Sequence, residues 1–395
     1  MRILFISRSP TMPLFLGDRL ILYHLAHSLA QRGHTFDLLA LDDRPDLTSE
    51  RHATDIPFNH VGYFPSTSRS MVKVLQQTVF GMSRFSKATT SATSPALAEA
   101  IVRRVQSTAY DVVHFFGGMQ VYEYASFVGS LPKLISPYES YTLYLKREVE
   151  AGHGGLMTSL RSYASRTYES FMFDPFKRVV VVSERDREML QTLNPTTPPD
   201  HFVVIPNGVI FNPKPEYTRE PASLLFTGNF EYAPNVIAAE HLIKTIFPAV
   251  RQQVPHAKLW LVGNAPPPSL LQHADESIII TGRVPDVVPY LEQATIYVSP
   301  LTVGAGIKNK ILEAMSAGCP VVATPISLDG IAAQDGVHAL VAPLEGIASQ
   351  VVRLLGDTPL RQQLSRDAQA LIQTRYSWQH VASAYETLYE TVKGL

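Results

Sequence analysis

The sequence predicts an α/β protein built from two Rossmann-like domains, each wound around a parallel sheet. The chain has 395 residues, 45% of which are apolar, whereas a single domain typically has about 150 residues. Short runs of Ile, Val, Leu and Phe alternate with longer stretches of helical period in both halves, a pattern typical of βα units with parallel strands. Ligands of open α/β sheets bind outside the carboxyl ends of the strands, so we expect the two domains to face each other across a cleft.

The charge balance gives the chain no net positive charge that would attract polyanions. The chain has 34 Lys and Arg residues against 35 Asp and Glu residues, a formal net charge of −1. We therefore expect no nucleic-acid partner, because such binding depends on an excess of basic residues. Cys319 is the only cysteine, so an internal disulfide bond is excluded. The apolar run at the start is too short for a signal-peptide core, and we expect a cytoplasmic protein.

The first half contains five runs that we expect to be strands: residues 2–7, 35–41, 111–116, 133–136 and 178–183. The first strand is followed by a long loop and a helix, with Asp18 as the predicted N-cap and Gly33 as the C-terminal stop. The helix face that packs on the sheet has apolar residues at i, i+3, i+4 and i+7, namely Leu22, Leu25, Ala26 and Leu29.

A linker divides the chain near its middle. Residues 194–221 are dense in Pro and Asn, and we place the boundary near residue 208. The predicted domains are therefore residues 1–207 and 208–375, followed by a helical stretch at 376–395. Strands of the second half are expected at residues 223–227, 258–262, 278–281, 296–299, 320–323 and 339–342.

Residues 299–324 carry the most chemical information. They form a pattern of strand, glycine-rich turn, helix and strand, in which Gly304 and Gly306 flank Ala305 and Ile307 begins the buried helix face. Small residues let a ligand approach the backbone, and the free N–H groups of a helix start are donors to phosphate. Lys308 and Lys310 are expected in the first helical turn, where the helix dipole disfavours cations, so a nearby diphosphate would explain them.

Glu313 follows Lys310 by three residues on the same side of that helix. A carboxylate in this place can accept two ribose hydroxyls, as in dinucleotide sites. The alternative is that Lys310 and Glu313 form a surface pair and that the glycines form an ordinary turn. Spacing alone leaves both interpretations open.

Six segments together resemble the retaining family 4 glycosyltransferases of the GT-B fold. They are IPNGV at 205–209, VVVVSERDREML at 179–190, LLFTGNF at 224–230, LWLVGN at 259–264, IITGRVPDVVPYLEQATIYVSP at 279–300 and the segment 299–324. MRILFIS, LAHSLAQRGH and YDVVHFF follow the order of the family more loosely. The resemblance covers essentially the whole chain, weakly at 43–108 and strongly at 179–325.

The resemblance implies transfer of a sugar from a UDP- or GDP-linked donor to a glycan, a lipid-linked acceptor or a small molecule. It implies that the second domain binds the donor, that the first faces the acceptor, and that the last helix, 376–395, crosses back to the first domain. Retention without a nucleophile follows from the family. No Asp-x-Asp motif and no His/Cys cluster with metal-ligand spacing is present, so we expect no metal and no cofactor. The protein is expected to be a monomer or a homodimer.

The resemblance also assigns donor-side residues. Glu313 matches the family glutamate near the ribose, but the first family glutamate falls on Ala305, which leaves the donor sugar to backbone groups at 304–307. The Arg and Lys that many members carry after the strand at 224–228 are replaced by GNFEYAPN, a form that resembles a bacterial subgroup associated with exopolysaccharide and cell-surface sugar transfer. We expect Lys308 and Lys310 to supply the missing charge. The remaining expected donor contacts are Gly228, Asn229, Gly263, Asn264, Gly282, Arg283, Val284, Gly304, Gly306 and Ile307.

The first domain offers fewer candidates. His114, in DVVHFF, is expected at the end of a strand facing the cleft, where it would join Lys308 and Glu313 as a catalytic residue; a structural role is the alternative. Gly17 and Asp18 are acceptor-side candidates, with helix capping as the alternative role of Asp18. Glu139, in a tyrosine-rich segment, is a third acceptor-side candidate.

Residues 66–98 contain four basic residues and no acidic residue, with apolar residues between them. They fit basic amphipathic helices that contact a membrane peripherally, at its inner face, and present a lipid-linked acceptor. A pair of helices covering the first sheet is the alternative. Two other functions remain open: a GT-B epimerase acting on the same donor, and a non-catalytic binding subunit, which the Ala305 replacement keeps possible.

Overall fold

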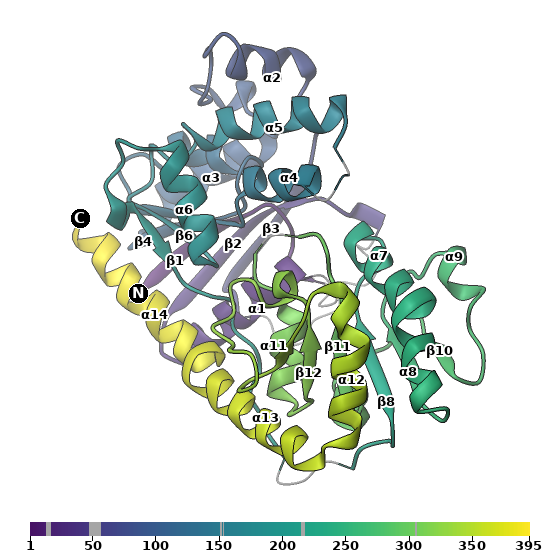
Figure 1. Ribbon diagram of the computed structural model, residues 1–395. Helices are drawn as coiled ribbons and strands as arrows, with labels where there is room; N and C mark the ends of the chain where they lie inside the picture. Colours follow the sequence, from purple (N-terminus) through teal and green to yellow (C-terminus); the bar gives the residue numbers. More distant parts are fainter. Residues whose placement is uncertain (13–16, 47–56, 151, 153, 215–217, 305) are drawn as a thin grey trace. The chain divides into compact units, whose positions relative to one another are not determined.

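The computed structural model describes residues 1–12, 17–46, 57–150, 152, 154–214, 218–304 and 306–395. Contacts between residues divide the chain into two compact units, and Figure 1 shows their helices and strands. Unit 1 comprises Met1–Pro206 and Val381–Leu395, and unit 2 comprises Asn207–His380. The chain therefore leaves unit 1 beside the boundary expected near residue 208 and returns to it within the last helix.

Unit 1 contains a parallel sheet with strand order β3-β2-β1-β4-β5-β6-β7 among the described residues. The strands are β1 (Arg2–Ser7), β2 (Thr35–Asp42), β3 (His60–Pro65), β4 (Val112–Phe116), β5 (Lys133–Tyr138), β6 (Arg178–Val181) and β7 (Phe202–Val204). The helices are α1 (Gly17–Ala30), α2 (Met71–Thr78), α3 (Pro95–Ser107), α4 (Tyr141–Glu150), α5 (Leu156–Glu169), α6 (Glu184–Leu193) and α14 (Trp378–Gly394).

Unit 2 contains a second parallel sheet, with strand order β10-β9-β8-β11-β12-β13 among the described residues. The strands are β8 (Ser223–Thr227), β9 (Lys258–Val262), β10 (Ile278–Ile280), β11 (Ile296–Ser299), β12 (Val321–Ala323) and β13 (Leu340–Val341). The helices are α7 (Ala233–His241), α8 (Phe247–Gln253), α9 (Pro268–Leu271), α10 (Val288–Gln293), α11 (Asn309–Ser316), α12 (Ile347–Gly356) and α13 (Thr358–Leu371). The prediction of two Rossmann-like domains is confirmed.

Three local predictions are wrong. The segment 194–221 is not purely a linker, because β7 pairs there in parallel with β6. Strand β3 was not predicted; its residues are mostly half-exposed, and it pairs with β2. Helix α1 begins at Gly17, so Asp18 lies in its first turn and not at the N-cap.

His114 lies in the core of unit 1, in the middle of β4, and not at the end of a strand as expected. Its side chain is fully buried, and its Nδ1 and Nε2 lie 2.8 Å and 2.7 Å from the hydroxyl oxygens of Tyr389 and Ser136. Burial also lowers the pKa of the imidazole well below its usual value. Since both ring nitrogens are occupied, the expected catalytic role of His114 is withdrawn, and the residue fixes α14 to the sheet.

A buried carboxylate anchors the segment that precedes α3. Glu123 lies in the short helical segment Tyr122–Val128 and is fully buried. Its oxygens are 3.2 Å from Nη2 of Arg69 and 2.8 Å from Nζ of Lys73, and it accepts hydrogen bonds from Ser86 and Thr93. Burial would raise the pKa of Glu123, but the Arg69 charge and these hydrogen bonds keep the pKa below its usual value.

We expect Glu123→Ala to destabilise the protein by about 3 kcal/mol, because two largely buried cations lose their counter-charge. The measurement is urea unfolding followed by circular dichroism. Glu99→Ala is the matched control: the Glu99 pair with Arg103 is exposed, so its loss should cost less than about 1 kcal/mol. Equal effects of the two substitutions would show that Glu123 is not an anchor.

Candidate functional site in unit 2

The strand order of unit 2 reverses between β8 and β11. From β8 the chain runs outward through β9 and β10 and then returns to the other side of β8 as β11. At such a switch point the loops after the two central strands separate and leave room for a ligand. The loops at issue begin at Gly228, after β8, and at Pro300, after β11.

Three predicted glycines meet at the carboxyl ends of β8, β9 and β10. Gly263 has φ +151°, and a Cβ there would lie 1.8 Å from the carbonyl oxygen of Gly228. The N–H of Gly263 donates to the carbonyl of Gly282 over 3.2 Å. Because Gly263 has no side chain, the backbones of the neighbouring loops can approach each other closely, and no other residue would fit there.

The predicted asparagines belong to the same loops. Nδ2 of Asn264 lies 3.2 Å from Oδ1 of Asn229, and the carbonyl of Asn264 accepts the N–H of Phe230 over 2.9 Å. Arg283 and Val284 follow Gly282, and the Arg283 side chain is exposed. The structure therefore brings together the expected donor residues at 228–229, 263–264 and 282–284.

The second wall of the site is the segment between β11 and α11. Gly304 and Gly306 have φ +138° and +63°, in the left-handed range that favours glycine. Ile307 is buried, as expected, whereas Ala305 lies outside the described residues. Helix α11 begins at Asn309, so Lys308 is its N-cap residue and not part of its first turn, which corrects the prediction. Nζ of Lys308 donates to the carbonyl of Gly306 over 2.6 Å.

Lys310 joins the two walls. Its Nζ donates to Oδ1 of Asn235 over 2.6 Å, and Nδ2 of Asn235 donates to the carbonyl of Asn229 over 2.7 Å. The ammonium also lies 4.3 Å from the centre of the Phe226 ring. Burial and the nearby Lys308 charge lower the pKa of Lys310 to about 7. The site therefore holds a lysine whose charge an incoming anion would stabilise.

Glu313 lies one turn after Lys310 on α11. Burial raises the pKa of its carboxyl; the Lys310 charge opposes this shift and the Asp286 charge adds to it. Within the described part of the chain, the Glu313 carboxylate accepts no hydrogen bond. The oxygens of the Glu313 carboxylate, beside the switch point, can therefore accept hydrogen bonds from the hydroxyl groups of a ligand.

Sequence reasoning missed two residues of this site, Asn235 and Phe226. Asn235 closes the YAPN motif, and its amide connects Lys310 with the loop after β8. The sequence feature that could have predicted Asn235 is the presence of the YAPN motif together with Lys308 and Lys310. Phe226 looked like any other apolar strand residue, and nothing in the sequence distinguishes it.

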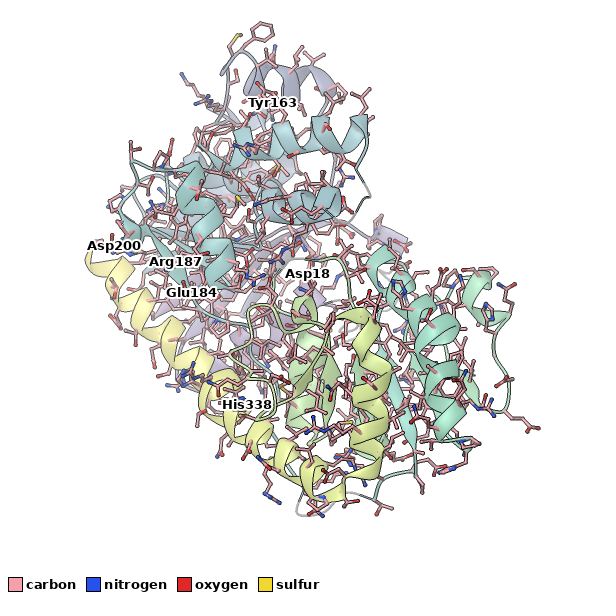
Figure 2. All side chains as sticks on the ribbon, in the orientation of Figure 1. Asp18, Tyr163, Glu184, Arg187, Asp200 and His338 are labelled. Atoms are coloured by element: carbon pink, nitrogen blue, oxygen red, sulfur yellow. The ribbon has the colours of Figure 1, made fainter. Side chains whose placement is uncertain are left out.

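The acceptor-side candidates lie in unit 1. Asp18, labelled in Figure 2, accepts hydrogen bonds from the Ser9 hydroxyl over 2.8 Å and from Nε of Arg8 over 3.2 Å. Burial would raise the pKa of Asp18, but the Arg8 charge keeps it below its usual value. Gly17 begins α1, and Glu139 follows β5 and is half-buried. Arg8 was not among the predicted residues.

Taken by itself, unit 2 has the features of a phosphate-binding α/β domain: a glycine-lined switch point, a helix start and two lysines. Comparison with known proteins agrees with this class. Residues 20–211 match the family model described as "Glycosyltransferase Family 4", and residues 221–357 match the model described as "Glycosyl transferases group 1". The chain belongs to the family 4 glycosyltransferases.

Curated relatives and solved structures are consistent with this assignment. The phosphatidyl-myo-inositol mannosyltransferase of Mycobacterium tuberculosis is 27% identical over 210 residues, which cover 49% of this chain and 54% of the relative. The corresponding Mycobacterium leprae protein is 28% identical over 205 residues, covering 48% and 54%. The chain thus spans about half the length of the curated relatives it matches.

Two solved structures share the fold over the full chain. Sucrose-phosphate synthase from Thermosynechococcus elongatus has a TM-score of 0.73 at 17% identity and covers 100% of this chain and 99% of its own. Anabaena HepE in complex with UDP-glucose has a TM-score of 0.64 at 17% identity, with 100% of both chains covered. At 17% sequence identity, the similarity to these two structures shows a shared fold and nothing more.

Proposed function

We propose that the protein is a retaining glycosyltransferase that moves a sugar from a UDP- or GDP-linked donor to a sugar, a glycan or a lipid-linked acceptor. Unit 2 would bind the donor and unit 1 the acceptor. The observation that carries the proposal is the Lys310–Asn235–Asn229 connection at the switch point of unit 2. This connection supports a diphosphate site because burial and the Lys308 charge lower the pKa of Lys310 to about 7, so a bound anion would stabilise the charged lysine.

The chemistry needs positive charge at this place. Cleavage of the bond between the anomeric carbon and the phosphate oxygen transfers negative charge to the departing diphosphate. Prearranged ammonium and N–H groups stabilise that charge more strongly in the transition state than in the ground state. Lys308, Lys310 and the first turn of α11 can supply these groups, and we propose that transfer proceeds without a metal ion.

Glu313 would hold the donor through its ribose. A carboxylate accepts two neighbouring hydroxyls, and this fixes the nucleotide without opposing the charge on the diphosphate. Retention would follow from attack on the face that the diphosphate leaves, with a departing phosphate oxygen accepting the proton of the acceptor hydroxyl. No protein nucleophile is needed in that sequence.

The direct test incubates the protein with UDP- and GDP-linked sugars in EDTA and follows nucleotide release with and without glycoside acceptors. We expect release with at least one donor, and a loss of at least a hundredfold in Glu313→Ala, because the ribose contact is removed. Glu345→Ala, at an exposed glutamate of unit 2, is the control and should keep full activity.

Each other outcome has a definite meaning. Full turnover in Glu313→Ala would refute the assigned site. Nucleotide binding without turnover on any donor would favour a non-catalytic binding subunit. Conversion of the donor sugar without its release would favour an epimerase.

We expect nucleotide binding to depend on pH through Lys310. Because an anion stabilises the charged form of Lys310, binding of UDP or GDP raises the pKa of this lysine above about 7 and takes up a proton. We expect the Kd to rise about tenfold between pH 6.5 and pH 8.5, since one pKa unit corresponds to about 1.4 kcal/mol. Isothermal titration calorimetry measures both the Kd and the proton uptake.

Lys310→Arg is the control for this measurement. Arginine stays charged across the range, so its remaining pH dependence reports the ionisation of the ligand alone. Equal slopes for wild type and Lys310→Arg would contradict the prediction.

We also propose that unit 1 contacts an anionic membrane surface through α2 and α5. Figure 1 shows these helices side by side, and Figure 2 labels Tyr163 on α5. Both helices and the loop after α2 carry exposed large apolar side chains: Met71, Val72, Leu75, Val79, Phe80, Met82, Leu156, Met157, Leu160 and Tyr163. Exposed clusters of this kind mark interaction sites.

The charge around this apolar surface favours lipid as the partner. Arg84 and Lys87 follow the loop after α2 in sequence and are exposed, as are Arg161 and Arg166 on α5; basic residues combined with exposed apolar ones suit an anionic interface. Lys73 is not available for this purpose, because its ammonium is paired with Glu123. Among the described residues, no helix is long and apolar enough to cross a membrane.

Cosedimentation with phosphatidylglycerol-containing vesicles tests this surface. We expect Met71→Ser with Leu75→Ser, and separately Arg84→Gln with Lys87→Gln, to reduce the bound fraction at least threefold, because each removes one of the two attractions. Leu271→Ser, at an exposed apolar residue of unit 2, is the control. Unchanged binding in both double variants, or equal binding to neutral vesicles, would refute the proposal.

A further inference from the structure

The sheet of unit 1 has its own switch point, between β1 and β4. From β1 the chain runs outward through β2 and β3 and returns to the other side of β1 as β4. Arg8 is the first residue after β1, and its N–H donates to the carbonyl of Phe116, the last residue of β4, over 2.8 Å. Arg8 therefore lies where ligands bind in open α/β sheets.

Three neighbours fix the Arg8 side chain. Its Nε lies 3.2 Å from Oδ2 of Asp18, and its guanidinium carbon lies 4.7 Å from the centre of the Tyr138 ring. Gly117 leaves space for the stem: its φ is +117°, and a Cβ there would lie 2.8 Å from Cβ of Arg8. The position and plane of the guanidinium are thus set before any ligand arrives.

These contacts use only part of the donor capacity of Arg8. Its side chain is 34% exposed, and Nη1 and Nη2 donate to none of the described residues. Arg19, eleven residues on, is different: its side chain is fully buried and donates to the carbonyl of Met12 and to Asp43. Arg19 is structural, whereas Arg8, directly after β1 at the switch point, keeps the four N–H donors of Nη1 and Nη2 available.

The backbone beside Arg8 is strained. Tyr138 has φ +73°, which is rare for a residue with a side chain. The following turn is held in place by Asp186 and Glu169, which accept the N–H groups of Ser140 over 2.9 Å and Tyr141 over 2.7 Å. Strain of this kind persists where the surroundings enforce it and clusters at functional sites. Here the enforced backbone conformation of Tyr138 keeps its ring against the Arg8 guanidinium.

We propose that Arg8 contacts the acceptor directly and that this acceptor group is an uncharged sugar or polyol. The proposal rests on the glycosyltransferase function proposed above. Asp18, 3.2 Å from Nε of Arg8, already offsets the Arg8 charge, and the neighbouring Arg19–Asp43 pair is neutral. These two pairs offer an anionic acceptor no surplus positive charge, whereas a hydroxyl group can both donate to the Asp18 carboxylate and accept from Nη1 or Nη2 of Arg8.

The test uses two assays on the full chain. The first measures transfer to p-nitrophenyl glucoside, mannoside and galactoside, and to p-nitrophenyl glucuronide and glucose 6-phosphate. The second measures binding of the same compounds without donor, by saturation-transfer NMR. We expect at least one neutral glycoside to bind and to be used, and both anionic compounds to be at least tenfold poorer.

Arg8→Ala should raise the KM for the accepted glycoside at least tenfold and weaken its NMR-detected binding, while the Kd for UDP or GDP changes less than twofold. Arg8→Lys, which keeps the charge but not the planar fork, should recover only part of the loss. Arg103→Ala, at an exposed arginine on α3, is the control and should change neither quantity. Circular dichroism reports whether each variant is folded.

Three outcomes overturn the inference: an unchanged KM and unchanged binding in Arg8→Ala, preference for an anionic acceptor, or no neutral glycoside binding to the wild type. Absence of nucleotide release with every donor is a separate result. It would remove the proposed function while the NMR measurement still decides whether Arg8 binds a neutral sugar.

Discussion

The candidate donor site depends on one hydrogen bond, from Lys310 to Asn235. A buried ammonium group loses hydration, and this burial, together with the nearby Lys308 charge, lowers the pKa of Lys310 to about 7. The Asn235 oxygen and the Phe226 ring compensate only in part, because neither carries a full charge. The arrangement is therefore more favourable with an anion than without one. The same amide fixes the loop after β8, so the position of the charge and the shape of the loop are set together.

The sequence was a good guide wherever a feature is local. Buried strands such as β1 and β8 are continuous apolar runs, and the glycines at their ends lie next to them in sequence. Two strands lack this signal. β3 is interrupted by Gly62, and most of its residues are half-exposed. β7 has only three residues within a Pro-rich stretch, and pairing with β6 makes it a strand.

Roles that depend on distant contacts could not be predicted. A histidine next to phenylalanines in a strand is compatible with a catalytic or a structural role, and the hydroxyl that decides between them belongs to Tyr389, 275 residues away. Asn235 and Lys310 are 75 residues apart, and only the fold brings them together. Arg8 was not predicted because its neighbours are distant in sequence: Gly117 follows β4, and Tyr138 is the last residue of β5. Sequence motifs predicted which segments form the candidate sites, whereas the roles of individual residues depend on tertiary contacts.

The return of the chain to unit 1 has a consequence for biosynthesis. Residues Val381–Leu395 complete unit 1: Tyr389 binds His114, and Glu386 pairs with Arg32 and His34 near the start of the chain. On the ribosome, all of unit 2 is made before these residues emerge. Until unit 2 has been made, unit 1 therefore lacks the segment that covers His114. A chain that stops within unit 2 lacks Val381–Leu395, so its first domain stays incomplete although that domain was begun first.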